Sequence, residues 1–174
     1  PCHIRNSDPY RKASLLVERS LRTGQGQRFE LDIDKFKEEL KVRGWCQRLP
    51  HGVLHGGVGL EHGWFIKGHL GEITGFEHAT EGAFIYDIAE AISSWCFAQD
   101  VFVPALLRAF IDGYTGVRFL GDLETHQLYR ACKASLASIG ISLLYHYEIR
   151  RHPHDVLYYQ DYRHYMKRLH SIKS

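Results

Sequence analysis

The segment between His51 and Asp87 limits the fold of this chain more than any other, because its pattern is that of strands while the flanking sequence is helical. A short apolar pair, Val53 and Leu54, leads into a run of glycines that predicts a tight loop. Apolar residues return at 64–66 and 73–74 on either side of a glycine-containing turn, which is the pattern of a β-hairpin. A glycine-rich loop beside a hairpin is typical of the site-bearing segment of an enzyme, yet this one is short of acidic residues.

The rest of the chain has apolar residues spaced three and four apart, as amphipathic helices require. We expect Asp32 or Asp34 to cap the second helix and Asp100 to cap the fourth. The fifth is apolar on more than one side and is expected to be the central core helix. The expected helices cover residues 10–23, 32–43, 84–97, 101–114, 122–151 and 154–172.

These elements predict a mainly α-helical chain with a small β-hairpin, of the α+β class. We expect a single domain over residues 1–174, because a chain of this length buries its apolar surface in one core. Two leading helices occupy 1–48, the loop and hairpin occupy 49–80, and a helical core occupies 84–174. The first residue is Pro1 rather than methionine, and we expect the sequence to be a processed or truncated product.

Composition and charge exclude several classes of protein. Apolar residues make up 44% of the chain and charged residues 24%, with a net charge of +2, which is typical of a globular protein and too small to indicate nucleic acid as a general partner. No apolar run reaches the ~18 residues of a membrane span and no signal-peptide pattern is present, so we expect a soluble intracellular protein. The four cysteines form no CxxC pair and favour a reducing compartment, either the cytoplasm or the mitochondrial matrix.

Three motifs in the middle of the chain resemble those of one enzyme family. LPHGVLHGG at 49–57 resembles a catalytic loop that normally reads His-x-Asp with an Asn five residues after the Asp. GEITGFEHA at 71–79 resembles the next strand with its metal-binding Asp, and IYDIAEAISSWCF at 85–97 is close to a Tyr-Asp-Leu-Ala pattern with a Trp-Cys-Phe ending. The chain thus resembles the carboxy-terminal lobe of the homoserine kinase and aminoglycoside phosphotransferase family, which has a protein-kinase-like fold. The resemblance implies that the nucleotide-binding amino-terminal lobe is absent.

The resemblance also assigns the chemistry to three positions. In this fold a carboxylate accepts the proton of the attacking hydroxyl, and an Asn and a second Asp hold magnesium. Here the catalytic Asp falls on Gly57, the metal-binding Asn on His62 and the second metal-binding Asp on Gly75. A glycine has no side chain that could take a proton or hold a cation, so the resemblance implies a degenerate site.

Four other residues belong to the site that the resemblance implies. His55 keeps the family's histidine and is interpreted as a packed imidazole that holds the loop. Asp87 keeps an aspartate that braces the loop through hydrogen bonds to its backbone. Glu61 and Glu77 are acidic residues close to the altered positions and are the candidate substitutes.

Other site chemistries have little support in the sequence. The glycines at 56, 57 and 59 lack the Lys-Ser/Thr pair of a phosphate-binding P-loop. Zinc needs three or four converging ligands, and the histidines here form no HExxH motif and accompany no cysteine pair. We therefore expect neither a metal nor a cofactor. The histidines concerned are His51, His55, His62, His69 and His78.

The last helix combines tyrosines with basic residues, such as Tyr162, Tyr165 and Arg168. Tyrosine and arginine are common at protein interfaces, so we expect protein partners in a larger complex; the alternative is that these are ordinary core and surface tyrosines. The same basic aromatic helix is a candidate RNA contact.

Three functional hypotheses follow. The first is a non-catalytic pseudoenzyme that serves as a structural or protein-interaction subunit of a larger assembly, for example a mitochondrial complex such as the mitoribosome. The alternative is an ATP-dependent small-molecule kinase that uses Glu61 or Glu77 in place of the missing acids, or that is joined to a separate amino-terminal lobe. The third is a binding module that keeps the acceptor pocket for a metabolite.

Overall fold

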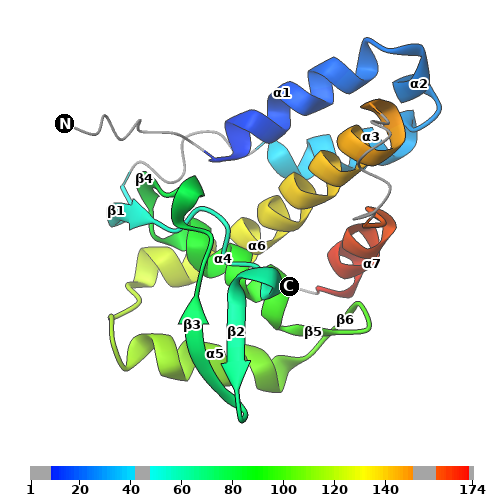
Figure 1. Cartoon of the computed structure of the whole chain (residues 1–174). Helices are drawn as coiled ribbons and strands as arrows, with labels where there is room; N and C mark the ends of the chain where they lie inside the picture. The colour runs from blue at the N-terminus through cyan, green and yellow to red at the C-terminus, as the bar shows by residue number, and fades with distance from the viewer. Residues whose placement is uncertain (1–8, 42–47, 151–159, 173–174) are drawn as a thin grey trace.

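The computed structural model describes residues 9–41, 48–150 and 160–172. Five of its helices form the frame: α1 (Pro9–Leu21), α3 (Glu30–Leu40), α4 (Ile85–Trp95), α6 (Asp122–Leu143) and α7 (Arg163–Ser171). Helix α6 crosses the molecule diagonally and packs against the other four (Figure 1). The prediction of a central core helix is therefore confirmed, and the chain is mainly helical with small sheets. Among the described helices none is long and apolar enough to cross a membrane.

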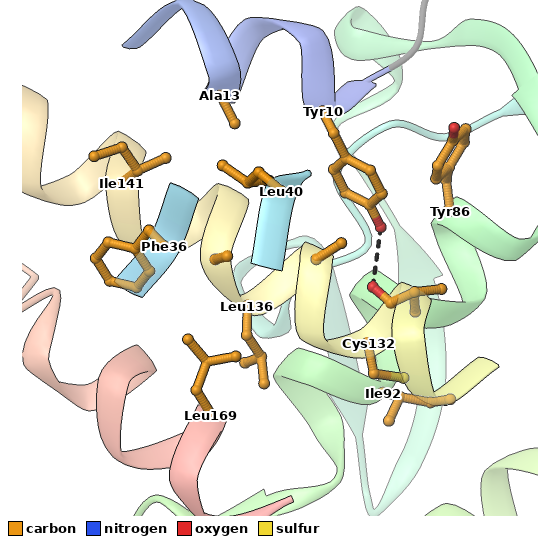
Figure 2. Close-up of a cluster of buried hydrophobic side chains, with 14 of the residues drawn as sticks. Tyr10, Ala13, Phe36, Leu40, Tyr86, Ile92, Cys132, Leu136, Ile141 and Leu169 are labelled. Atoms are coloured by element: carbon orange, nitrogen blue, oxygen red, sulfur yellow. Dashed lines mark hydrogen bonds between the residues drawn. The ribbon is translucent and has the colours of Figure 1, made fainter. Parts of the chain in front are cut away.

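The hydrophobic core lies where α1, α3, α4 and α7 meet α6 (Figure 2). Phe36 and Leu136 are fully buried there, and Leu169 of α7 reaches the same cluster. The hydroxyl of Tyr10 donates to the backbone oxygen of Ala131 at 3.1 Å, which ties α1 to the middle of α6. Burial of a tyrosine ring stabilises the fold through its apolar area, and the buried hydroxyl needs a hydrogen-bond partner as well.

A buried ion pair fixes the start of α6. Glu124 is 1% exposed. Its carboxylate accepts hydrogen bonds from the Arg118 guanidinium at 3.0 Å and from the backbone N–H of Gly121 at 3.2 Å. The carboxylate therefore satisfies a free N–H group at the beginning of the helix, where negative charge is also favoured by the helix dipole.

The first two helices begin and end differently from the prediction. Gly24 and Gly26 do not simply end α1, because Gly24–Gln27 forms a short helix, α2. The Thr23 hydroxyl caps α2 by accepting a hydrogen bond from the backbone N–H of Gly26. Neither Asp32 nor Asp34 caps α3, since the helix begins at Glu30 and both lie inside it. The expected continuation of α3 to Arg43 falls outside the described residues.

The predicted hairpin is confirmed, and it is one of three small antiparallel sheets in the described part of the chain. Strands β2 (Gly63–Ile66) and β3 (His69–Ile73) form the hairpin, which extends to the bottom of Figure 1. Strand β1 (His51–Leu54) pairs with β4 (Thr80–Ala83), a pairing that the prediction missed. Because this pairing joins the two ends of the segment, the loop, the hairpin and the short helices η1 (Leu60–His62) and η2 (Phe76–His78) all lie between two fixed strands.

Asp100 does not cap a helix, and this prediction was wrong. It lies in the tight turn between β5 (Phe97–Ala98) and β6 (Val101–Phe102), where its φ of 65° is left-handed. Its carboxylate instead accepts hydrogen bonds from His164 and Arg168 of α7, which hold its pKa below the ordinary value although burial acts in the opposite direction.

Helix α5 (Pro104–Thr115) begins three residues later than expected and has no buried residue. Leu106, an apolar residue of this helix, is 43% exposed, so α5 lies at the surface.

The end of the chain is less helical than predicted in the part that is described. After α6 the backbone continues as a π-helix, η3 (Leu144–Arg150), and α7 begins only at Arg163. Tyr162 is 2% exposed and donates its hydroxyl to Asp32 at 2.7 Å. This tyrosine therefore belongs to the core. The first part of the expected last helix, residues 154–159, lies outside the described residues.

Candidate functional site

The glycine-rich loop between β1 and η1 is held by one carboxylate. Asp87 lies in the first turn of α4 and accepts the backbone N–H of His55 at 2.7 Å and that of Gly56 at 3.0 Å. Gly56 has a φ of 78°, which a glycine adopts without strain. The two hydrogen bonds expected of Asp87 are therefore present, and they fix the loop to α4 from a distance of about thirty residues along the chain.

His55 is a packed residue beneath this loop. It is 8% exposed, and its Nε2 lies 2.7 Å from the backbone oxygen of Thr74, so Nε2 is the nitrogen that donates. The rings of Phe76 and His62 lie 4.5 and 5.5 Å from its own ring. These contacts connect the loop to the segment that follows β3, which is a structural role.

His62 occupies the centre of the three altered positions. Its Nδ1 forms a short hydrogen bond with the backbone oxygen of Gly57. Its ring lies so close to Gly75 that a β-carbon there would come within 2.5 Å of it, and Gly75 also has a φ of 94°. A β-carbon at Gly57, in contrast, would meet His62 only at 3.5 Å, an ordinary contact. The imidazole thus fills the space beside Gly75 but leaves room beside Gly57.

The candidate substitute acids differ in position. Glu61 lies in η1 at the end of the loop, is exposed, and folds its carboxylate against Gly59. Glu77 lies in η2 and is also exposed.

A further acid, Glu90, was missed by the sequence prediction. Burial, assisted by the carboxylates of Asp87 and Glu61 and opposed by His62, raises the pKa of Glu90 to about 7. Its position three residues after Asp87 on α4 was the available signal, because residues three apart share a helix face.

The described residues do not fit the magnesium ions that the family resemblance implies. They contain no group of three or more His, Cys, Asp or Glu side chains that could hold a metal ion. Gly57 and Gly75 offer no side-chain oxygen, and the nitrogens of His55 and His62 that have partners bond to backbone oxygens. A hard cation such as magnesium prefers carboxylate and other oxygen ligands.

Comparison with known proteins finds homoserine kinases. The chain is 34% identical to the homoserine kinase of Parvibaculum lavamentivorans over 125 residues, which are 70% of this chain and 37% of that protein. It is 28% identical to the homoserine kinase of Brucella melitensis over 136 residues, 78% of this chain and 39% of that protein. For the homoserine kinase of Methylobacterium radiotolerans the identity is 34% over 92 residues, 52% of this chain and 29% of that protein.

These similarities support a homoserine kinase-like family for the chain. No model of a protein family matches the chain. The matched segments span only between 29 and 39% of the length of these three relatives.

The two glycines of the site should respond differently to a side chain. We expect Gly75→Ala to lower the free energy of unfolding by about 1–3 kcal/mol, because the β-carbon would contact His62 and would also hold a left-handed backbone. Gly57→Ala is the matched control and should leave it unchanged or raise it by up to about 1 kcal/mol. Urea unfolding of both variants measures this; equal losses would contradict the packing of His62 described above.

The pKa of Glu90 predicts how stability depends on pH. Its folded-state pKa of about 7 lies above the ordinary value of 4.5, so the folded state binds this proton more tightly and loses stability as pH rises between these values. We expect Glu90→Gln to raise the free energy of unfolding at pH 8 by about 2 kcal/mol and to have little effect near pH 4.5. The control variant is Glu77→Gln. If the unfolding free energy of Glu90→Gln differed from that of the wild type by the same amount at all pH values, the raised pKa of Glu90 would be contradicted.

Proposed function

We propose that the chain contributes the loop-bearing part of a phosphotransferase-like protein that acts on a small hydroxyl compound, such as the homoserine in its relatives' names. The similarity to homoserine kinases over 125 residues supports this proposal. The observation that carries it is the group of carboxyls at the loop: Asp87 holds the loop backbone, and Glu61 and Asp87 both act on the pKa of Glu90.

Glu61 is the acid that fits the proton-accepting role best. Transfer of a phosphoryl group to a hydroxyl needs a carboxylate that orients the hydroxyl and takes its proton. Glu61 is exposed, lies at the end of the braced loop, and is close enough to Glu90 to raise its pKa. Glu77 is equally exposed, but no contact ties it to the loop among the interactions of the described residues.

The nucleotide and its magnesium need groups that the described residues do not provide. Under this proposal those groups belong to a separate lobe or to another chain, while this chain positions the acceptor. No step of the reaction is assigned to a metal held by the described residues.

A second candidate function is a non-catalytic subunit of a larger assembly. It is favoured by Gly57 and Gly75, which stand at the positions of the catalytic and metal-binding acids, and by His62, whose ring fills the space beside Gly75. An assembly in mitochondria has no support in the described residues or in the relatives' names.

Exchange of the two exposed acids tests the first candidate. We expect Glu61→Gln to lower kcat/KM for phosphoryl transfer by about 100-fold or more, because a positioned base contributes on this scale. Glu77→Gln is the matched control and should change it less than about twofold. The assay supplies Mg-ATP with homoserine, choline or an aminoglycoside to the full protein, together with any chain that co-purifies with it.

A calorimetric titration with Mg-ATP accompanies the assay. Absence of both saturable Mg-ATP binding and transfer in the folded protein would reject the first candidate and support the second. If turnover were unchanged in Glu61→Gln, the proton-accepting role of Glu61 would be rejected, but the first candidate function would not.

A further inference from the structure

The β2–β3 hairpin exposes apolar side chains that a protein normally buries. Seven of the sixteen exposed large apolar residues in the described part of the chain lie within residues 60–76. In Figure 1 the hairpin points away from α1 and α3. The seven are Leu60 (53% exposed), Trp64 (63%), Phe65 (56%), Ile66 (66%), Leu70 (50%), Ile73 (42%) and Phe76 (62%).

Among the described residues, the contacts that support the hairpin lie on the face of Phe65. The ring of Phe65 lies 5.7 Å from that of Trp95, at the end of α4, and Gly63 is packed against the same tryptophan. The Nε1–H of Trp95 donates to the backbone oxygen of Val58 at 3.0 Å, which fixes this indole. Because side chains alternate along a strand, Ile66 points to the face opposite Phe65, and it is the most exposed of the set. Trp64 is the next most exposed, and the pairing of β2 with β3 is irregular between Trp64 and Phe65.

The strand edges are equally unprotected. The sheet has two strands, so within the described residues β2 and β3 each have one edge without a neighbour. A two-stranded hairpin is marginally stable by itself, and proteins usually protect free edges with charges, proline or a covering element. Strand β2 contains no charged residue and no proline.

We propose that β2 pairs antiparallel with β2 of a second copy of this chain, about a two-fold axis at Phe65. This arrangement places Trp64 of one copy opposite Ile66 of the other and forms a continuous four-stranded sheet. The seven exposed side chains together offer roughly 800 Å² of surface that a second copy could cover, and one partner of a stable interface contributes an area of about this size. The proposal does not depend on the proposed phosphotransferase activity.

The charges of the hairpin also suit pairing with the hairpin of a second copy. It carries Glu72 near its base, where Glu72 is paired with Trp64, and Lys67 and His69 at its tip. A two-fold axis at Phe65 brings the tip of each hairpin toward the base of the other, so acidic and basic groups approach one another rather than their own kind.

Sedimentation equilibrium of the full chain over a range of concentrations tests the dimer. We expect the wild type to show twice the monomer mass, and Trp64→Glu to raise the dimer dissociation constant at least ~10-fold, because a buried tryptophan often dominates an interface. Val117→Glu is the matched control, since Val117 is 93% exposed and lies outside the hairpin; it should leave the constant unchanged.

A cross-link tests the geometry even if Trp64→Glu fails to fold. Residues at the two-fold axis of an antiparallel pair have Cα atoms roughly 4.5–5.5 Å apart, within disulfide range. Under mild oxidation, Phe65→Cys should form a covalent dimer, whereas Val117→Cys and the wild type should not. A folded monomer at all concentrations, as when another domain covers the hairpin, or equal cross-linking of Phe65→Cys and Val117→Cys, would overturn the proposal.

Discussion

The two hydrogen bonds from the loop backbone to Asp87 are the constraint on which the site depends. A carboxylate that accepts two N–H groups makes charge-assisted bonds, which are roughly twice as strong as neutral ones. They join the loop to α4, and α4 packs on the central helix α6. Through Asp87 the helical core therefore fixes the backbone of the loop at His55 and Gly56.

The residues that hold the loop are thus different from those that would carry out a reaction, so the first set can be present without the second. The frame consists of Asp87, the packed ring of His55 and the closing β1–β4 pair, and all of it is in place. The family resemblance places two of the reacting acids at Gly57 and Gly75, which have no side chain. A braced loop is needed for catalysis but does not establish it, so the proposed activity rests on Glu61 and on groups supplied from elsewhere.

Local patterns predicted the helices and the hairpin because both signals lie within a few residues. The β1–β4 pair was missed, since His51 and Ala83 meet only through the tertiary fold. Asp100 was taken for a helix cap from its residue type, whereas Pro104 in the first turn marks the true start of α5. The raised pKa of Glu90 depends on burial and on neighbours from two elements, which no single-sequence pattern records.

Hydrogen exchange of the His55 and Gly56 amides tests the central role of Asp87 most directly. Asp87→Asn keeps the size of the side chain but removes the charge and one acceptor oxygen, and a hydrogen bond to a charged group contributes about 1.5–3 kcal/mol. We expect both amides to exchange at least ~10-fold faster in this variant, while the paired amides of β1 and β4 keep their protection. Unchanged exchange at His55 and Gly56 in Asp87→Asn would show that the loop is held by other contacts and would contradict this account.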